Sequence, residues 1–272
     1  MDRRTTPANA RAAHDSLRGQ IEAPRFTAGE PAQVSLPLVD LLAAPGGARD
    51  RQLLLGDGFL VIDRHEGFAF GRADKDGFCG YVAEAALTAP GAPTHWVAAP
   101  ATHLYSAARV QAPERAGLSF GARLTVTGAA GIFSETTEGH VPTQHLRPLG
   151  EVFADPVEVA MLFLGTPYLW GGNSRSGIDC SGLVQAALLA CGIACPGDSD
   201  LQQAIGEEVA EAELRRGDLL FWKGHVAMIV DATRMIHATG QFMQVVVEET
   251  RTAIDRIAAQ DAGPVIARRR PR

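Results

Sequence analysis

Short apolar segments separated by turn-forming residues make up the first half of the chain after residue 33. The expected strands are 51–58, 59–63, 67–72 and 78–82. Alternation of apolar and other residues with a period of two is typical of strands, and the Gly and Asp residues between the segments are typical of turns. Strands this short predict a small β-barrel over residues 34–90 rather than alternating strands and helices.

A weaker copy of this pattern follows Pro90–Pro93, which we interpret as a linker. Comparable places are occupied by the apolar segments 95–98, 104–105, 124–128 and 139–142. We therefore expect a second small barrel over residues 94–150, which an internal duplication would explain. Residues 1–33 are polar and show no periodicity, so we expect an irregular arm that lies on the surface.

Helical patterns begin at 155–158, where Asp, Pro and Glu occupy the N-cap, first and third positions of a helix that Gly165 ends. A second helix is expected over 180–191, with Asp179 as its N-cap and Gly192 as its stop. Four strand candidates follow, 219–222, 225–230, 234–238 and 244–248. Helices followed by an antiparallel meander predict an α+β domain.

Cys180 lies at the junction between a loop and the second helix. The preceding run, 165–173, is rich in glycine, proline and aromatic residues and cannot continue a helix. In the first turn of a helix, unpaired backbone N–H groups and the positive end of the helix dipole favour thiolate over thiol. This setting indicates a cysteine nucleophile.

Two histidines follow Cys180 in the chain, His225 and His237. A cysteine nucleophile needs a base and a group that orients the base. If residues 231–233 form a turn, Ala227 stands opposite His237, and His225 is its diagonal neighbour at roughly 7–8 Å on the same face. A slip of one residue would put the two histidines on opposite faces, where they would be ordinary half-buried strand residues.

Five motifs occur in order and with suitable spacing: Gly165–Gly172, Asp179–Val184, Arg216–Phe221, His225–Met228 and Ile236–Ala238. Together they resemble the NlpC/P60 family of papain-like cysteine peptidases. The resemblance implies an α+β papain-like catalytic domain over residues 151–272, with Cys180 as nucleophile, His225 as general base and His237 as the orienting residue. It also implies bacterial cell-wall peptides as substrates, commonly cut between γ-linked D-glutamate and a diamino acid.

Residues around Cys180 fit such a substrate. Asp179 could pair with the ammonium of a free N-terminal L-Ala, or serve as the N-cap, or do both. Trp170 and Tyr168 could form walls of the pocket, and the Tyr168 hydroxyl could donate to the oxyanion. The alternative for both aromatic residues is packing in the core.

Three more polar residues join the substrate-binding set. Ser181 stands in the nucleophile motif. Asp198 and Ser199 resemble, with Gln202, a short motif that some members of the family place beside the amine pocket. The alternative is that these are ordinary polar loop residues.

The first half of the chain resembles two bacterial SH3-like barrels ahead of the peptidase domain, as in γ-D-glutamyl-L-diamino acid endopeptidases that recycle muropeptides. In those enzymes the first barrel blocks the subsite beyond L-Ala, which restricts cleavage to peptides with a free amino terminus. Tyr81 matches the barrel tyrosine that reaches the substrate amine, and Asp50 is the nearest candidate for a barrel acidic residue.

Composition narrows the function classes. A net charge of −6 gives no support for nucleic acid as a partner, and no run approaches the ~18 apolar residues of a membrane span. The start of the chain lacks the apolar segment of a secretory signal, so we expect a cytoplasmic protein. The basic residues 268–272 are expected to form a solvated, frayed tail.

Four cysteines in a chain of this length do not indicate a disulfide framework, and free thiols are expected. Cys79 and Cys191 are interpreted as small buried hydrophobic residues. The spacing of Cys191 and Cys195 could suggest a metal, but no second Cys/His pair stands near them in sequence, so no metal or other cofactor is expected.

The sequence leaves alternatives to a recycling peptidase. An exported hydrolase or amidase would use the same residues on intact peptidoglycan. A binding module with an inactive peptidase domain would only recognise wall peptides, and an acyltransferase would pass the acyl group to an amine.

Overall fold

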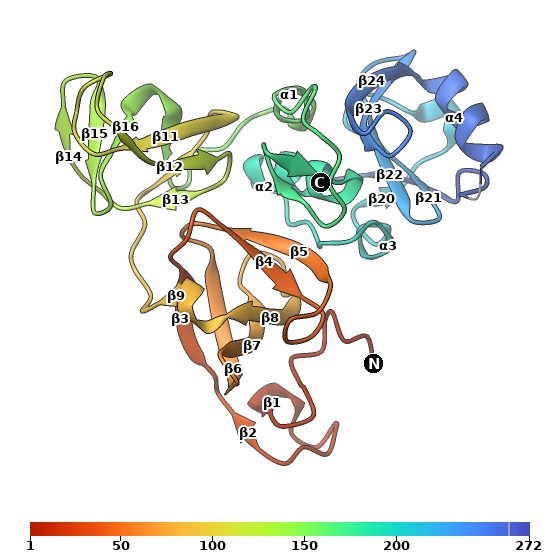
Figure 1. Ribbon diagram of the computed structural model, residues 1–272. Helices are drawn as coiled ribbons and strands as arrows, with labels where there is room; N and C mark the ends of the chain where they lie inside the picture. Colours follow the sequence, from red (N-terminus) through yellow and green to blue (C-terminus); the bar gives the residue numbers. More distant parts are fainter. Residues whose placement is uncertain (261) are drawn as a thin grey trace. The chain divides into compact units, whose positions relative to one another are not determined.

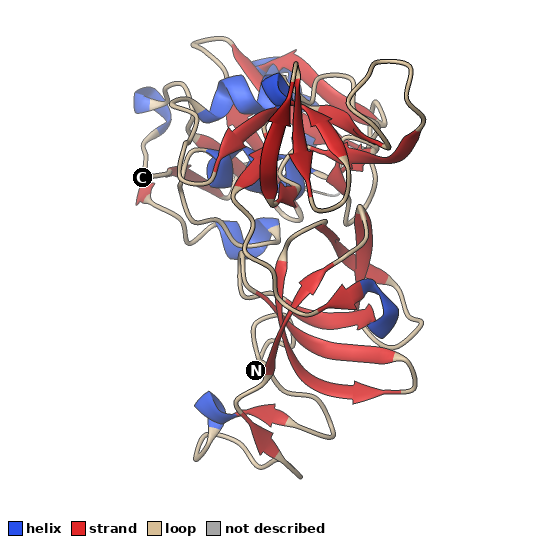
Figure 2. Ribbon diagram, turned by 90° about the vertical axis from the view of Figure 1, so that its left-hand side faces the viewer, coloured by secondary structure: helices blue, strands red, loops and turns tan. Residues whose placement is uncertain are grey.

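The computed structural model divides the chain into two units, residues 1–149 and 150–272 (Figure 1). It describes residues 1–260 and 262–272. The first unit consists mainly of strands, loops and short 3-10 helices, and the α-helices of the described residues lie in the second unit. Figure 2 colours the strands red and all helices, 3-10 helices included, blue. This change of character begins where the sequence predicted it, at 155–158.

An antiparallel sheet of order β5-β4-β8-β7-β6-β3-β9 dominates the first unit. Its strands are β3 (Glu30–Val34), β4 (Leu38–Leu42), β5 (Arg49–Leu54), β6 (Gly58–His65), β7 (Phe68–Ala73), β8 (Cys79–Ala83) and β9 (Leu87–Thr88). The strands expected at 59–63, 67–72 and 78–82 are confirmed as β6, β7 and β8, and β5 ends before the expected limit at 58. Alternate residues such as Leu41, Leu53 and Phe59 point into one buried cluster.

The N-terminal segment packs on this sheet and is partly regular. It contains β1 (Ala13–His14), which pairs in parallel with β2 (Phe26–Thr27), and a 3-10 helix η1 (Asp15–Leu17). Ala12 is fully buried against the residues Ile62, Phe70 and Cys79. Strand β3 begins at Glu30, before the boundary at residue 34 that the sequence suggested.

The rest of the first unit contains two smaller sheets. One has the order β13-β10-β17, and the other has the order β12-β11-β16-β15-β14. The strands are β10 (His95–Val97), β11 (Ala101–Tyr105), β12 (Glu114–Ser119), β13 (Arg123–Leu124), β14 (Val126–Ala130), β15 (Phe133–Thr136), β16 (His140–Pro142) and β17 (Leu146–Pro148). Short 3-10 helices η2 (Glu84–Ala86) and η3 (Thr143–His145) precede β9 and β17.

These sheets pack against the end of β5. Leu54 and Leu55 share a buried cluster with residues of the smaller sheets such as Val97 and Leu118, and Arg123 N donates to Leu55 O at 2.8 Å. At Gly56, φ is +81° and a Cβ would meet Arg123 O at 2.5 Å, so only glycine permits this approach.

The second unit places helices beside an antiparallel sheet of order β20-β25-β21-β22-β23-β24. Its strands are β20 (Glu207–Glu208), β21 (Leu219–Trp222), β22 (His225–Ile229), β23 (Arg234–Thr239), β24 (Gln244–Glu249) and β25 (Ala267–Arg270). A separate two-stranded sheet consists of β18 (Asn173–Ser174) and β19 (Gly177–Ile178). The helices are α1 (Pro156–Met161), α2 (Cys180–Ala190), α3 (Ser199–Gln202) and α4 (Thr250–Ala258), with a 3-10 helix η4 (Glu211–Glu213). Helix α2 packs on β22 and β23, and its nearly complete burial makes it the centre of this unit.

The C-terminal residues correct one expectation. Residues 268–270 belong to β25, an interior strand between β20 and β21, and do not form a solvated tail. Arg270 Nε and Nη2 each donate to the carboxylate of Asp218 at 2.8 Å, and Asp218 is only 1 % exposed. Arginine stems can cover a sheet while their guanidinium groups reach distant carboxylates, so a basic run does not have to be a tail.

We expect Asp218→Asn to lower the melting temperature by about 5 °C, because a neutral amide at the buried position 218 cannot balance the charge of the partly exposed Arg270. Asp218 also accepts from Arg215 N, at 2.9 Å. The measurement is thermal unfolding followed by circular dichroism. Asp255→Asn, which breaks the exposed Arg251–Asp255 pair, is the control and should change the melting temperature by less than about 1 °C. Equal small shifts in both variants would contradict the structural role of Asp218.

Candidate active site

The first turn of α2 holds Cys180 as the sequence predicted. Asp179 is the N-cap, and its Oδ1 accepts from Gly182 N at 2.6 Å and from Ser181 Oγ at 2.9 Å. Gly192 ends the helix with φ of +75°. A Cβ at position 182 would meet Gly172 O at 2.5 Å, so glycine lets the preceding loop lie directly on the turn that carries the cysteine.

His225 and His237 meet on one face of the sheet. Met228 pairs with Ile236, which is the register expected from a turn at 231–233. His225 Nε2 lies 2.8 Å from His237 Nδ1, and the ring centroids are 5.0 Å apart. The prediction that the two imidazoles are diagonal neighbours in contact is confirmed.

Glu248 is the residue of this network that the sequence analysis missed. His237 Nε2 lies 2.7 Å from Glu248 Oε1, and Arg256 of α4 forms an ion pair with the same carboxylate. In the β23–β24 register His237 is opposite Val246, so Glu248 is its diagonal neighbour on the same face. The rule that related His225 to His237 points to Glu248 only once the β23–β24 register is known.

The pKa values of this network follow from its burial. Burial raises the pKa of the Cys180 thiol to about 12, with a further contribution from Asp179, although backbone N–H groups of Val226, Ser181 and Cys180 lower it. Burial, then His237 and Arg256, lower the pKa of His225 to about 3. Burial of the Glu248 carboxyl acts to raise its pKa. The hydrogen bond from His237 and the electrostatic attraction of His237 and Arg256 outweigh burial, so the pKa of Glu248 is lowered.

The expectation of a resting thiolate therefore needs correction. The helix N–H groups act in the expected direction, but burial of a side chain that is 5 % exposed outweighs them. A thiolate or an imidazolium alone is unfavourable here, whereas the two charges formed together attract each other. The sulfur accepts a hydrogen bond from the backbone N–H of Val226, the residue that follows His225.

The loop before α2 lies beside the cysteine. Burial, then the charges of Cys180 and Asp179, raise the pKa of the Tyr168 hydroxyl. Trp170 is 70 % exposed, so the alternative of core packing is wrong for this residue. Asp179 Oδ2 accepts from Gly171 N at 2.9 Å and ties the loop to the helix.

Ser181 and Ser199 are buried. Helix α3 begins at Ser199 with Asp198 as its N-cap residue. Gln202 Nε2 of α3 donates to Ser181 O at 2.9 Å and to Pro196 O at 3.0 Å, which fastens α3 to the first turn of α2. Substrate contacts of Ser181, Asp198 and Ser199 stay predictions.

Tyr81 and Asp50 lie in the first unit, on β8 and β5. The Tyr81 ring packs on Phe70 with centroids 5.0 Å apart. The Asp50 carboxylate accepts two hydrogen bonds from the Arg3 guanidinium, at 2.6 and 2.8 Å. Their contact with the substrate amine stays a prediction, and an amine at Asp50 must compete with Arg3.

The cysteines other than Cys180 differ in burial. Cys79 and Cys195 are buried, which confirms the interpretation of Cys79, but Cys191 at the end of α2 is only half-buried. Within residues 1–260 and 262–272, no group of three or more His, Cys, Asp or Glu side chains is arranged to hold a metal ion. No helix of that described part is long and apolar enough to span a membrane.

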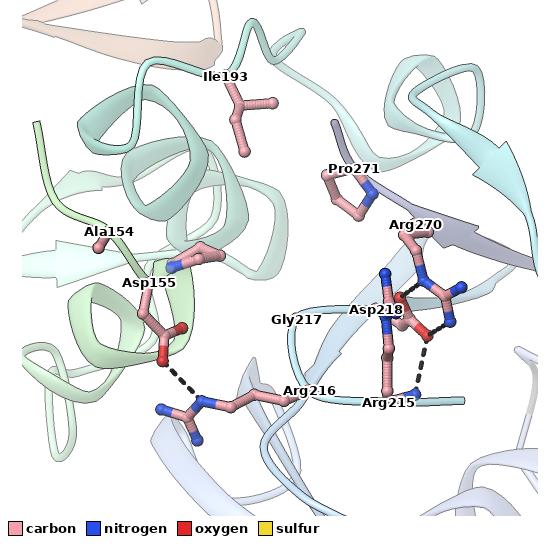
Figure 3. A pocket seen from close by; sticks show the side chains of 10 residues that line it. Ala154, Asp155, Ile193, Arg215, Arg216, Gly217, Asp218, Arg270 and Pro271 are labelled. Carbon is pink, nitrogen blue, oxygen red and sulfur yellow. Dashed lines mark hydrogen bonds and ion pairs between the residues drawn. The ribbon is translucent and has the colours of Figure 1, made fainter. Parts of the chain in front are cut away.

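A cavity of about 410 Å³ lies beyond the other end of α2 (Figure 3). Its lining includes Ile193, just after the helix, and two ion pairs, Asp155–Arg216 and Asp218–Arg270. The length of α2, about 15 Å at 1.5 Å per residue, separates this cavity from Cys180. The two carboxylates balance most of the positive charge of the arginines in the lining. The lining residues come from the ends of α1, β21 and β25, so the cavity lies where these elements meet.

Comparisons with known proteins identify two matched regions. Residues 165–257 match the NlpC/P60 family, and residues 41–87 match the bacterial dipeptidyl-peptidase Sh3 domain. Cys180, His225, His237 and Glu248 all fall within the first region. The SH3-like nature of the strands after residue 94 stays a prediction, as does an internal duplication.

Two curated relatives each match about a third of the chain. Dipeptidyl-peptidase 6 of Lysinibacillus sphaericus is 39 % identical over 84 residues, which are 30 % of this chain and 31 % of that protein. Gamma-D-glutamyl-L-lysine dipeptidyl-peptidase of Bacillus subtilis is 37 % identical over 101 residues, 34 % of each protein. The chain thus spans about a third of the length of these relatives.

A solved structure covers much more of the chain. An NlpC/P60 family protein from Bacillus cereus superimposes with a TM-score of 0.76 over 89 % of this chain and 99 % of that one, at 21 % sequence identity. This similarity extends the likeness in fold beyond the two matched regions.

Proposed function

Residues 165–257 are an NlpC/P60 domain, and from this premise we propose that the chain is a cysteine peptidase acting on murein peptides. The observation that carries the proposal is the hydrogen-bonded chain of His225, His237 and Glu248, together with Cys180 at the start of α2. The cysteine stands at a helix N-terminus, and the backbone N–H beside His225 donates to its sulfur. A nucleophile, a base and an orienting group are therefore all present.

The reaction uses the proton of the Cys180 thiol. His225 takes this proton as the sulfur attacks the carbonyl carbon, and the Tyr168 hydroxyl donates to the oxyanion that forms. His225 then gives the proton to the amine as it departs, and the acyl group remains on Cys180 as a thioester. Water, deprotonated by His225, releases the acid and restores the thiol.

The bond to be cut joins γ-linked D-glutamate to a diamino acid, either meso-diaminopimelate or L-lysine. Support comes from the relatives named gamma-D-glutamyl-L-lysine dipeptidyl-peptidase. Asp179 supplies a carboxylate next to the nucleophile, and it is held in place by Gly171, Ser181 and Gly182. A fixed carboxylate suits the free ammonium of an N-terminal L-Ala.

The substrates are released peptides with a free amino terminus, and the enzyme acts in cytoplasmic recycling of murein peptides. Support comes from the match of residues 41–87 to an Sh3 domain described from bacterial dipeptidyl-peptidases. In this proposal Tyr81 and Asp50 take part in recognition of the free substrate amine. A hydrolase or amidase of intact wall would instead have to accept a substituted amine.

The test compares L-Ala-γ-D-Glu-meso-diaminopimelate with the same peptide acetylated at its amino terminus. We expect kcat/KM for the acetylated peptide to be lower by about 100-fold, because a charge-assisted hydrogen bond is lost. Product release is measured by liquid chromatography, with purified sacculi as a third substrate. Equal cleavage of both peptides together with digestion of sacculi would overturn the recycling role and favour a wall hydrolase.

A further inference from the structure

Glu248 ends a chain of hydrogen bonds that runs through both histidines toward Cys180. We propose that Glu248, paired with Arg256, is a positioning residue that fixes the tautomers of His237 and His225 and leaves Nδ1 of His225 free of hydrogen to receive the thiol proton. This inference rests on the proposed peptidase function and adds a residue to its machinery.

The tautomers follow from what each group can donate. An ionised carboxylate only accepts hydrogen bonds, so the 2.7 Å contact with Glu248 Oε1 puts the hydrogen of His237 on Nε2. Nδ1 of a neutral His237 is then an acceptor. That atom lies 2.8 Å from His225 Nε2, which must donate. The remaining ring nitrogen of His225, Nδ1, is therefore the basic atom of the resting pair.

Burial of His237 makes the other tautomer costly. His237 is completely buried, and a buried N–H without an acceptor would cost about 1–3 kcal/mol. Glu248 supplies that acceptor, and its own side chain is only 14 % exposed. The Arg256 guanidinium balances the carboxylate and lies 5.5 Å from the centroid of the Phe242 ring. Helix α4 thus holds the carboxylate in place on β24.

The carboxylate also acts on the charge that catalysis creates. When His225 takes the proton of Cys180, its positive charge is shared along the hydrogen bonds to His237 and Glu248. The other groups close to this charge are Arg256, which opposes it, and Asp179 beside the cysteine. Removal of the Glu248 charge makes protonated His225 less favourable and weakens the base.

A purely structural role for Glu248 makes a different prediction. If Glu248 only fastened α4 to the sheet through Arg256, its loss would reduce stability and would leave the histidine tautomers and the pH profile unchanged. Measurements on the chemistry of the two imidazoles therefore separate the two roles.

The test uses Glu248→Gln in the full chain, with Glu249→Gln as the matched control. Glu249 caps α4 by accepting from Thr252 N, and the amide oxygen of glutamine can do the same. In Glu248→Gln we expect kcat to fall by about 10- to 100-fold with KM little changed, and the acid limb of kcat/KM to move to lower pH. Glu248→Asp, which keeps the charge, should recover part of kcat. Wild-type kcat and an unmoved acid limb in Glu248→Gln would overturn the proposal.

Two readouts need no peptide substrate. Nitrogen-15 NMR of the histidine rings should show the Nε2–H tautomer for both His225 and His237 in the wild-type protein, and a mixture for His237 in Glu248→Gln. Labelling of Cys180 by iodoacetamide, followed by peptide mapping, should be slower in Glu248→Gln than in Glu249→Gln. If these results hold while no peptide is cleaved, the positioning role stands and the peptidase function fails. A wild-type His237 with hydrogen on Nδ1 would overturn the positioning role even if the peptide is cleaved.

Discussion

Replacement of Cys180 by alanine is expected to abolish cleavage of L-Ala-γ-D-Glu-diamino acid peptides, with a loss on the order of 10⁴-fold or more. The variant keeps a good helix former in the first turn of α2, and Asp179 still caps the helix through Gly182 N. The fold should therefore persist, with a circular dichroism spectrum like that of the wild type. Chromatographic assay of the released amine measures the loss.

Cys191→Ala provides the matched control for this variant. Cys191 lies at the other end of the same helix, is half-buried and has its pKa raised to about 11, first by burial and then by Asp155 and Glu158. Its replacement should leave turnover unchanged. Residual activity in Cys180→Ala, or equal loss in Cys191→Ala, would show that Cys180 is not the nucleophile.

Replacement of His225 by alanine is expected to reduce turnover by about 10²- to 10⁴-fold. It should also change the pH dependence of Cys180 labelling by iodoacetamide. In the wild type His225 can take the thiol proton, and because its own pKa is lowered it stays an available base well below pH 6.5. Without His225 the thiol keeps the raised pKa that burial and Asp179 impose. Labelling should then rise only in the alkaline range.

Peptide mapping of the labelled protein assigns the reaction to Cys180 and leaves Cys79 and Cys195, both buried, as internal references. The rate at neutral pH should fall by about tenfold or more in His225→Ala, since each unit of pKa changes the thiolate fraction tenfold. The same labelling profile in wild type and variant would mean that His225 does not receive the thiol proton.

Local signals in the sequence were sufficient to place Cys180 in the first turn of a helix. The N-cap residues Asp155 and Asp179 and the stop at Gly192 act on their own helices, so neighbouring residues determine them. The turn at 231–233 is equally local, and it set the register that brings His225 to His237. Interactions between residues close together in the chain were therefore enough to predict both the position of Cys180 and the contact between the two imidazoles.

Contacts between residues far apart in the chain, and burial by the whole domain, could not be predicted from the sequence. Glu248 reaches His237 through a hairpin whose tip contains Met243 with φ of 52°, a conformation that a non-glycine residue rarely adopts and that the sequence does not signal. The place of Arg270 in the sheet was not predicted, because its ion-pair partner, Asp218, lies far from it in the chain. The raised pKa of Cys180 depends on burial by the whole domain, whereas the helix dipole is a property of α2 alone.

The proposed activity is hydrolysis of the bond between γ-linked D-glutamate and the diamino acid by the thiol of Cys180. Mass spectrometry of L-Ala-γ-D-Glu-meso-diaminopimelate after incubation with the protein tests it most directly. The proposed function predicts L-Ala-D-Glu and free diaminopimelate as the products, and neither of them with Cys180→Ala. An intact peptide with the wild-type protein, or cleavage between L-Ala and D-Glu instead, would contradict it.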